Sequence, residues 1–411
     1  MNPIPGINSP RPDEPRARFL VELARALGTY GTSSNRLEEV IAVCADDLGL
    51  SAQTFNTPTS VFVSVESDEG CSTYLARVTP GEADLTKLMA IDRVFNRVIE
   101  KKIRPEEGTA EIKQIVKMAP RYPAWMMVLS FGVVSGCAGH FLGGATKEML
   151  ASAIVGLVVG FLVLFTGKRR EFSRLMEFLS GLSAALISGV LAVPFGGYMP
   201  AVAGIAGLII LLPGLTLTVA MVELATKHVV SGTARLAGAV MVLMVIGFGV
   251  VIGQHIVVGV VGELAVVEAE PMAWWVDLIS VIVATVFMTI LFQAHFRHAW
   301  VMVIAGLLSF YSARYGTEQF GPEVGVLCAA MAVGIASNLY ARVFDRPALT
   351  MMLPGLLMLV PGSLGLRSLQ LFLDNDTVDG VQSAFTVMVI GVALVVGLLL
   401  ANVILPPRKV L

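Results

Sequence analysis

Two Pro-Gly pairs stand inside long apolar segments and are the features best suited to binding a small polar molecule. They are Pro213-Gly214, in LIILLPGLTLT (208–218), and Pro361-Gly362, in LLMLVPGSLGL (356–366). In a membrane helix proline removes a backbone hydrogen bond and an adjacent glycine lets the chain unwind, so the freed carbonyl and amide groups need other partners. The alternative interpretation is a kink that serves packing alone. Hydroxyl side chains follow both pairs, and the predicted substrate-binding residues are Pro213, Gly214, Thr216, Thr218, Pro361, Gly362 and Ser363.

Four ionisable side chains lie inside or at the ends of apolar segments, where a charge is costly and therefore indicates function. Glu223, which follows the first Pro-Gly pair, is the favoured proton-coupling acid, and Asp277 is the second candidate. His140 and Arg367 are weaker candidates. Each of the four could instead be an interfacial residue that snorkels or forms an ion pair.

The sequence contains no pattern that predicts catalysis or a bound cofactor. It has no nucleotide-binding loop, zinc-ligand spacing or nucleophile elbow, and its four cysteines lie far apart without a CxxC pair. We therefore expect no catalytic residue, no metal ion and no cofactor, and a protein that is not an enzyme. A net charge of −2 and a pI near 6.2 give no reason to expect nucleic-acid binding, which usually needs a basic face.

The elements that carry these residues belong to two compartments of different composition. The 411-residue chain is 55% hydrophobic, and residues 1–120 hold 31 of its 60 charged residues. From residue 121 onward, ten apolar runs approach the roughly 20 residues that a membrane-spanning helix needs. The expected spans are 124–141, 149–165, 175–193, 198–220, 236–253, 272–292, 299–311, 320–341, 349–372 and 383–405. The seventh is short, and the apolar stretch 255–267 either extends the fifth span or lies at the membrane interface.

Charge placement predicts the orientation of the ten spans. Eleven Lys and Arg residues near span ends fall on the side of the amino-terminal domain, and three fall on the opposite side. Because positive residues near membrane ends stay cytoplasmic, both termini and the amino-terminal domain are expected in the cytoplasm.

An internal repeat relates the two halves of the membrane region. The two Pro-Gly pairs are 148 residues apart, Pro200 and Pro347 are 147 apart, and Trp125 and Trp275 are 150 apart. Spans one to five and six to ten are therefore predicted to be copies. Because five is odd, the second copy enters the membrane from the opposite side, an inverted symmetry that is typical of secondary transporters.

Four segments follow from these patterns: a disordered tail, an α+β domain and two five-helix repeats. They cover 1–18, 19–120, 121–254 and 272–411. The tail lacks the apolar run of a signal peptide, and in the domain two β-rich runs, 60–66 and 72–78, predict a hairpin. The domain's polar residues are assigned to turns and to helix caps, Ser33 or Ser34 among them. The domain is therefore expected to gate or assemble the protein and to lie off the transport path.

The run YGTSSNRLEEVIAVCADDLGL (30–50), followed by FNTPTSVFVSV (55–65) and by ten spans in two sets of five, resembles the bacterial threonine/serine exporter (ThrE) family. The resemblance covers nearly the whole chain from about residue 19. It implies export of threonine and serine across the bacterial cytoplasmic membrane, driven by the proton motive force. Some split relatives are associated with dicarboxylate export, which keeps a succinate-like substrate open.

The expected mechanism is that of a secondary exporter in which a small zwitterion binds between spans four and nine. The expected partners are this small molecule and the lipid bilayer, with a homo-oligomer as an open alternative. A channel or a ligand-sensing membrane protein is the competing interpretation.

Overall fold

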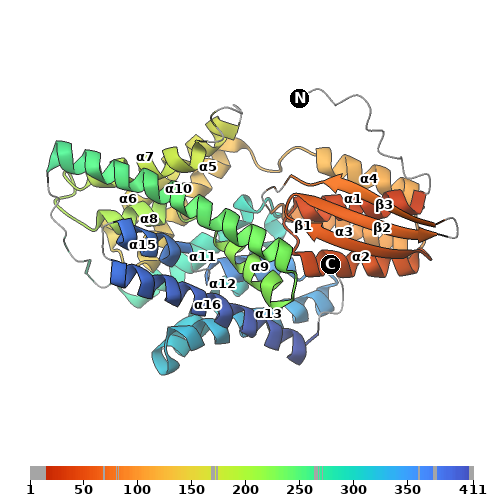
Figure 1. Cartoon of the computed structure of the whole chain (residues 1–411). Helices are drawn as coiled ribbons and strands as arrows, with labels where there is room; N and C mark the ends of the chain where they lie inside the picture. The colour runs from red at the N-terminus through yellow and green to blue at the C-terminus, as the bar shows by residue number, and fades with distance from the viewer. Residues whose placement is uncertain are drawn as a thin grey trace.

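The computed structural model describes residues 15–67, 70–79, 81, 83–167, 172, 175–262, 267, 269–270, 272–359, 362–373 and 377–406. The expected tail up to residue 14 and the predicted site residue Pro361 lie outside these ranges. Figure 1 shows two parts: an α+β domain at one end, built from the amino-terminal elements, and a larger helical part formed by the rest of the chain.

The amino-terminal domain combines a three-stranded antiparallel sheet with four helices, of which the first two contact the sheet and the other two pack against those helices. Its elements are α1 (Pro15–Thr29), α2 (Ser34–Asp47), β1 (Ser51–Thr57), β2 (Ser60–Ser67), β3 (Gly70–Arg77), α3 (Leu85–Ile99) and α4 (Pro105–Lys117). The strands lie in the order β1-β2-β3, with Ser60 opposite Arg77 in the predicted hairpin. Helix α1 begins at Pro15, four residues earlier than expected. The sequence does not predict strand β1, because the polar run SAQTFNT contains few of the residues that favour strands.

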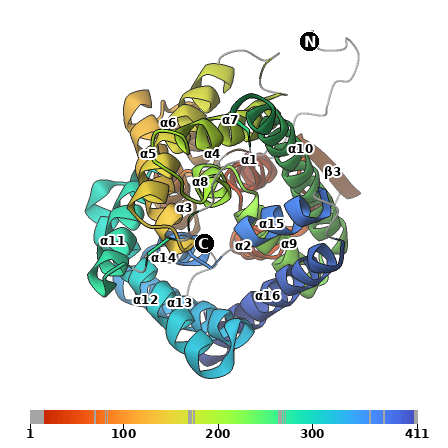
Figure 2. The same ribbon diagram turned by 90° about the vertical axis from the view of Figure 1, so that its left-hand side faces the viewer.

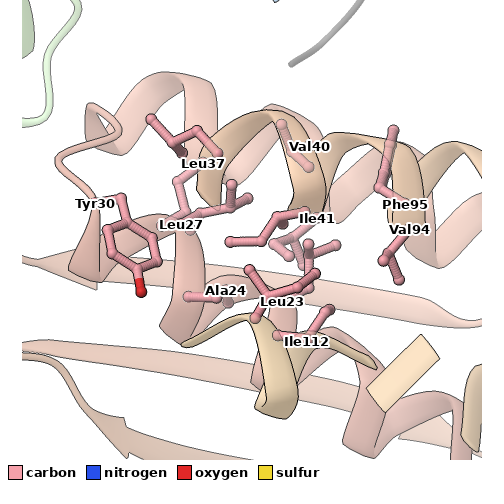
Figure 3. Close-up of a cluster of buried hydrophobic side chains, with 14 of the residues drawn as sticks. Leu23, Ala24, Leu27, Tyr30, Leu37, Val40, Ile41, Val94, Phe95 and Ile112 are labelled. Carbon is pink, nitrogen blue, oxygen red and sulfur yellow. The ribbon is translucent and has the colours of Figure 1, made fainter. Parts of the chain in front are cut away.

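The core of this domain follows from the alternation of strand residues. Val61, Val63 and Val65 all point to the buried face of β2 and meet the apolar stripes of the helices. Figure 3 shows side chains of α1, α2, α3 and α4 converging in this core, Leu23 and Ile41 among them. Helix α1 ends at Thr29 and is followed by a turn that leads to α2.

The helical part contains twelve α-helices and one short 3-10 helix among the described residues. They are α5 (Ala124–Phe141), α6 (Thr146–Gly167), α7 (Met176–Leu191), α8 (Pro200–Gly207), α9 (Gly214–Ala225), α10 (Val229–Val261), α11 (Trp274–Leu291), η2 (Phe296–His298), α12 (Ala299–Phe320), α13 (Pro322–Phe344), α14 (Leu349–Leu357), α15 (Gly362–Leu373) and α16 (Thr377–Ile404).

Seven segments of the described chain are long and apolar enough to cross a membrane. They are α5, α6, α10, α11, α13, the α14–α15 segment 349–368, and α16. The other three expected spans do not meet this condition, for different reasons: α7 has 16 residues, span four is divided into α8 and α9, and α12 extends to Phe320 with Arg314 and Glu318 in its last turns. The stretch from His255 to Val261 extends the fifth span as part of α10.

Continuous helices and the short helices of the interrupted spans occupy different places in the helical part. In Figure 2 the continuous helices α5, α6, α7, α10, α16, α13, α12 and α11 form the circumference, and the short helices α8, α9, α14 and α15 lie inside it. Large apolar side chains on the circumference are exposed, such as Phe161, Phe248 and Phe385 at 61%, 57% and 67%. Such a surface is unfavourable in water and suits contact with lipid.

Candidate functional site

Both expected interruptions of helix are present, and they meet in space. Span four is interrupted between α8 and α9, where Pro213 is the N-cap of α9 and Gly214 its first residue. Span nine is interrupted between α14 and α15, whose first residue is Gly362. A Cβ atom placed on Gly362 would lie 3.2 Å from Leu212 Cβ and 3.4 Å from Gly214 Cα. Gly214 and Gly362, far apart in the sequence, therefore lie close together in space.

A cavity of about 830 Å³ extends from the first interruption to the amino-terminal domain. Helices α9, α10, α13, α14 and α16 supply one side of its wall, and α1, α2 and the turn between them supply the other. Pro213, Thr216 and Thr218 line this cavity, whereas Gly214, Gly362 and Ser363 do not. The predicted substrate residues are thus divided, and those that line the cavity all belong to the first interruption.

Several buried oxygen atoms in the cavity wall lack a hydrogen-bond partner among the described residues. They are Thr218 Oγ1 from α9, and Thr32 Oγ1 and Asn35 Oδ1 from the amino-terminal domain. Thr218 is 4% exposed and Thr32 is 2% exposed. Since an unsatisfied buried polar group costs about 1–3 kcal/mol, these atoms indicate a place that holds water or a polar ligand.

The charged groups of the cavity wall come from α2 and α10. Arg36 and Glu39 lie one turn apart on α2, and Arg235 lies on α10. Burial lowers the pKa of the Arg36 guanidinium, while the neighbouring carboxylates of Glu39 and Asp92 act in the opposite direction. Arginine nevertheless stays charged in proteins, so Arg36 brings a partly desolvated cation to the cavity.

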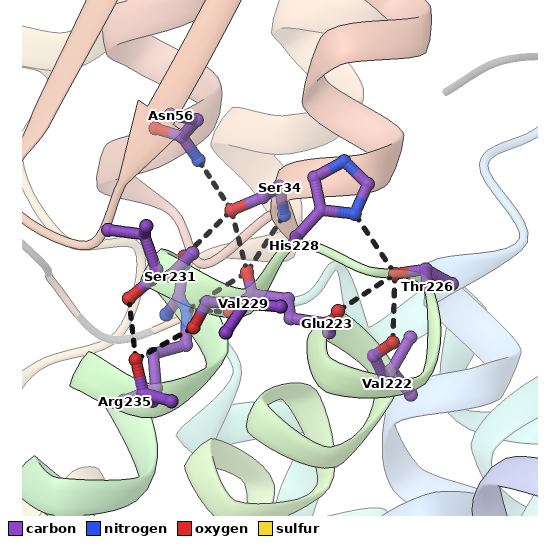
Figure 4. Close-up of polar contacts among 11 residues, drawn as sticks. Ser34, Asn56, Val222, Glu223, Thr226, His228, Val229, Ser231 and Arg235 are labelled. Atoms are coloured by element: carbon purple, nitrogen blue, oxygen red, sulfur yellow. Dashed lines mark hydrogen bonds and ion pairs between the residues drawn. The ribbon is translucent and has the colours of Figure 1, made fainter.

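Glu223 lies at the junction of the two parts of the chain and is fully buried (Figure 4). Arg235 Nε lies 3.1 Å from each of its carboxylate oxygens. The backbone N–H and the hydroxyl of Ser34 reach Glu223 Oε1 at 2.9 and 2.8 Å. Ser34 Oγ also lies 2.8 Å from Ser231 Oγ and accepts a hydrogen bond from Asn56 Nδ2 at 3.1 Å.

These contacts correct the expectation that caps and turns account for the domain's polar residues. Ser33 makes no capping hydrogen bond to α2 through its side chain. Ser34 is the first residue of α2, and its N–H is one of the donors that a helix start leaves unsatisfied. Glu223 of α9 accepts from this donor and brings a negative charge to the positive end of the helix. The cap expected from a neighbouring serine is therefore supplied by a distant carboxylate.

The amino-terminal domain is attached to both halves of the helical part. In the first half, His228 Nε2 lies 3.1 Å from Glu38 Oε2, beside the Glu223 contacts. In the second half, Leu85 N–H donates to Phe292 O at 3.0 Å and Thr86 Oγ1 donates to Gln293 O. The domain thus contacts the end of α9 and the end of α11, so a movement of one half relative to the other must alter at least one attachment.

Asp277 belongs to a separate cluster at the opposite end of α11. Its carboxylate contacts His140 Nε2 at 2.7 Å and Arg314 Nη1 at 2.6 Å. The 18 residues of α11 correspond to about 27 Å at 1.5 Å per residue, which separates this cluster from the attachment at Gln293. Arg367 lines another cavity, of about 330 Å³, between α15 and α16.

Sequence reasoning missed the contribution of the amino-terminal domain to this site. Thr32, Asn35 and Arg36 fall in the run YGTSSNRLEE, on which the family resemblance rests. The sequence therefore contains a signal for these residues, although the polar residues of the domain are predicted to serve turns and helix caps. Arg235 is one of the eleven Lys and Arg residues that the charge pattern places on the cytoplasmic side, and that pattern gives it no role in a site. Within the described residues, no group of three or more His, Cys, Asp and Glu side chains could hold a metal ion.

Comparison with known proteins places the chain in a family. The family described as "Putative threonine/serine exporter" matches residues 18–257, and the family described as "Threonine/Serine exporter, ThrE" matches residues 277–404. The chain therefore belongs to the threonine/serine exporter family, and it is a multi-pass membrane protein of mostly helical structure.

Similar curated proteins come from fungi. The pheromone-regulated membrane protein 10 of Saccharomyces cerevisiae is 27% identical over 91% of this chain and 49% of its own length. The protein of the same name from Candida glabrata is 24% identical over 90% of this chain and 47% of its own length. An uncharacterized protein of Schizosaccharomyces pombe is 25% identical over 85% of this chain. The chain thus spans about half the length of these relatives, and no solved structure matches it.

Proposed function

We propose that this chain is a secondary active exporter of small amino acids, threonine and serine, driven by the proton motive force. The observation that carries the proposal is the cavity of about 830 Å³ that reaches the interruption of span four, with the unpartnered hydroxyl of Thr218 in its wall. Unwound backbone and hydroxyl groups suit the ammonium, carboxylate and hydroxyl of such substrates. The family descriptions name the same substrate class.

The proposal includes ten spans arranged as two inverted five-helix repeats. Contacts between helix ends support this alternation, because residues expected on one side of the membrane touch each other. Asn338 near the end of α13 donates to Asn402 near the end of α16 at 2.9 Å. On the other side, His140 near the end of α5 contacts Asp277 at the start of α11.

For proton coupling we propose Glu223 and Asp277, one at each end of the helical part. Each carboxylate has a cationic partner, Arg235 for Glu223 and Arg314 for Asp277. Protonation of either carboxylate would break an ion pair that fixes two helices. A proton arriving from one side could therefore favour one arrangement of the halves over the other.

The proposed location is a bacterial cytoplasmic membrane with both termini in the cytoplasm. A reporter active only outside the cytoplasm, fused to the carboxyl terminus, should give no signal. Strong reporter activity would contradict the ten-span arrangement. The curated relatives are fungal. The topology should therefore be measured in the membrane of the organism from which this chain comes.

Transport by the purified full-length protein in proteoliposomes tests the function directly. Labelled threonine and serine should accumulate in response to a proton gradient, and their uptake should saturate. Gradient-driven uptake of succinate alone would favour a dicarboxylate exporter. Uptake that neither saturates nor responds to the gradient would favour a channel, and no uptake of the three compounds would contradict the proposal.

A further inference from the structure

We infer that α2 of the amino-terminal domain forms part of the substrate site, with Arg36 as the group that binds the substrate's carboxylate. The inference rests on the proposed export of small amino acids and names the residues that recognise them. It assigns to the domain a direct role in binding substrate, in addition to its attachment to both halves of the helical part.

The first observation is the composition of the cavity wall. Two arginines line the cavity, and Arg235 directs its Nε to both oxygens of Glu223, at 3.1 Å each. Arg235 is therefore engaged in holding α9, α10 and α2 together. Arg36 lines the same cavity from α2, near the carboxylates of Glu39 and Asp92.

The second observation is independent of charge and concerns the unpartnered oxygens near Arg36. Thr32 Oγ1 is buried in the same wall, four residues before Arg36 in the chain, and Asn35 Oδ1 is buried on the residue that directly precedes Arg36. Both atoms can accept a hydrogen bond from an ammonium group. Thr218 Oγ1 lies in the part of the wall formed by α9 and offers a partner for a substrate hydroxyl.

The chemistry of these groups defines the substrate class as a zwitterion. A guanidinium binds a carboxylate through two parallel hydrogen bonds, a geometry that lysine cannot reproduce. Glu39, one turn from Arg36 on α2, gives the same wall a negative charge that attracts an ammonium group. A dicarboxylate would satisfy Arg36 and be repelled by Glu39, so the pair favours an α-amino acid over succinate.

The experiment measures discrimination for the carboxylate rather than activity alone. Full-length protein in nanodiscs is titrated with threonine and with threonine amide, which keeps the ammonium and hydroxyl groups but lacks the carboxylate. Wild-type protein should bind threonine about tenfold or more tightly than the amide, as expected for a hydrogen-bonded charge pair. Arg36→Gln should bind both ligands with similar, weak affinity, and Arg36→Lys should recover only part of the discrimination.

Two controls separate binding from folding. Arg97→Gln removes a surface arginine of α3 that pairs with Glu111 at 2.7 Å, and it should leave discrimination unchanged. If Arg36→Gln perturbs the domain, Asn35→Ala and Thr32→Val supply a second measurement, since both should weaken binding of the amide as well as of threonine.

The outcomes distinguish this inference from the proposed function. If wild-type protein binds and transports threonine and Arg36→Gln keeps the wild-type preference for threonine over the amide, the assignment of Arg36 is wrong while the exporter function stands. If wild-type protein neither binds nor transports threonine, serine or succinate, the function itself fails and the assignment fails with it.

Discussion

The backbone N–H and the hydroxyl of Ser34 both reach Glu223 Oε1, at 2.9 and 2.8 Å, although 189 residues separate the two in the sequence. The carboxylate lies at the start of α2 and also pairs with Arg235 of α10. One buried group therefore joins the amino-terminal domain to two helices of the membrane region. Protonation or displacement of Glu223 would therefore alter its contacts with the start of α2, a helix that lines the cavity.

Ser34→Ala should loosen this junction without removing Glu223. The substitution deletes the hydroxyl contact and leaves the backbone N–H in place, so the expected loss is about 1.5–3 kcal/mol for a hydrogen bond to a charged group. Hydrogen exchange in the first turn of α2 should accelerate. Ser33→Ala is the matched control, because Ser33 makes no side-chain capping bond to α2. Equal exchange in both variants would contradict a junction at Ser34.

Glu223→Gln tests whether the carboxylate couples protons or only holds the structure. The change leaves the Arg235 side chain, which is 12% exposed, without its charge partner. Breaking a buried pair in this way costs about 3–5 kcal/mol, so the single variant should lose both thermal stability and gradient-driven export.

The double variant Glu223→Gln with Arg235→Gln separates the two effects. It removes the isolated charge and should regain much of the stability measured by thermal unfolding. Gradient-driven export should stay low while gradient-independent exchange of threonine persists. Recovery of gradient-driven export in the double variant would remove Glu223 from the coupling mechanism.

The sequence predicted those parts of the fold whose cause is local. Runs of apolar residues predicted the helices, and the alternation around 60–78 predicted the β2–β3 hairpin. The Pro-Gly pairs predicted where helices stop, because proline and glycine act on the backbone at their own positions. The end of α12 was missed because its last turns carry charge, and β1 was missed because its residues are polar.

The site was harder to predict because its contacts join distant parts of the chain. The repeat suggests that Pro213-Gly214 and Pro361-Gly362 belong together, and Gly362 does lie near Gly214. No local pattern shows that Ser34 lies beside Glu223 or that Arg36 shares a cavity with Thr218. A serine at a helix start has a common local use as a cap, and that use concealed its contact with another domain.

His298 predicts a pH dependence of stability at the connection between α11 and α12. Burial and the nearby charges of Arg297 and Arg346 lower its pKa to about 4, and Arg297 Nε donates to its Nε2 at 3.1 Å. An unfolded histidine has a pKa near 6.5, so between these values the unfolded chain binds more protons than the folded one. Stability should therefore fall as pH is lowered from about 6.5 towards 4.

The measurement for His298 is thermal unfolding of the purified protein from pH 7 to pH 4. His298→Gln keeps a polar group of similar size that cannot take up the proton, so it should reduce the slope over this range. His255 is a suitable control because it is exposed on α10 and its Nδ1 contacts the backbone oxygen of Val251 in the same helix. A slope that is unchanged in His298→Gln would assign the pH dependence to other groups.

Gly362→Ala tests whether the contact between the two interruptions has to open during transport. The added Cβ would lie 3.2 Å from Leu212 Cβ and 3.4 Å from Gly214 Cα, so the neighbouring backbone must yield by a few tenths of an ångström. If spans four and nine change their separation in each cycle, the larger residue should lower the transport rate more than it lowers stability. Gly362→Leu should do so more strongly.

Two other glycines serve as controls for the Gly362 variants. A Cβ on Gly259 of α10 would meet nothing within 4 Å, so Gly259→Ala should leave transport unchanged and raise helix stability by up to about 1 kcal/mol. A Cβ on Gly156 of α6 would lie 2.5 Å from Ser135 Oγ, so Gly156→Ala should act through stability. Transport rates and thermal unfolding are measured for all variants. If Gly362→Ala and Gly362→Leu both transport threonine at the wild-type rate, the contact between the interruptions is a packing contact, and the moving parts of the exporter lie elsewhere.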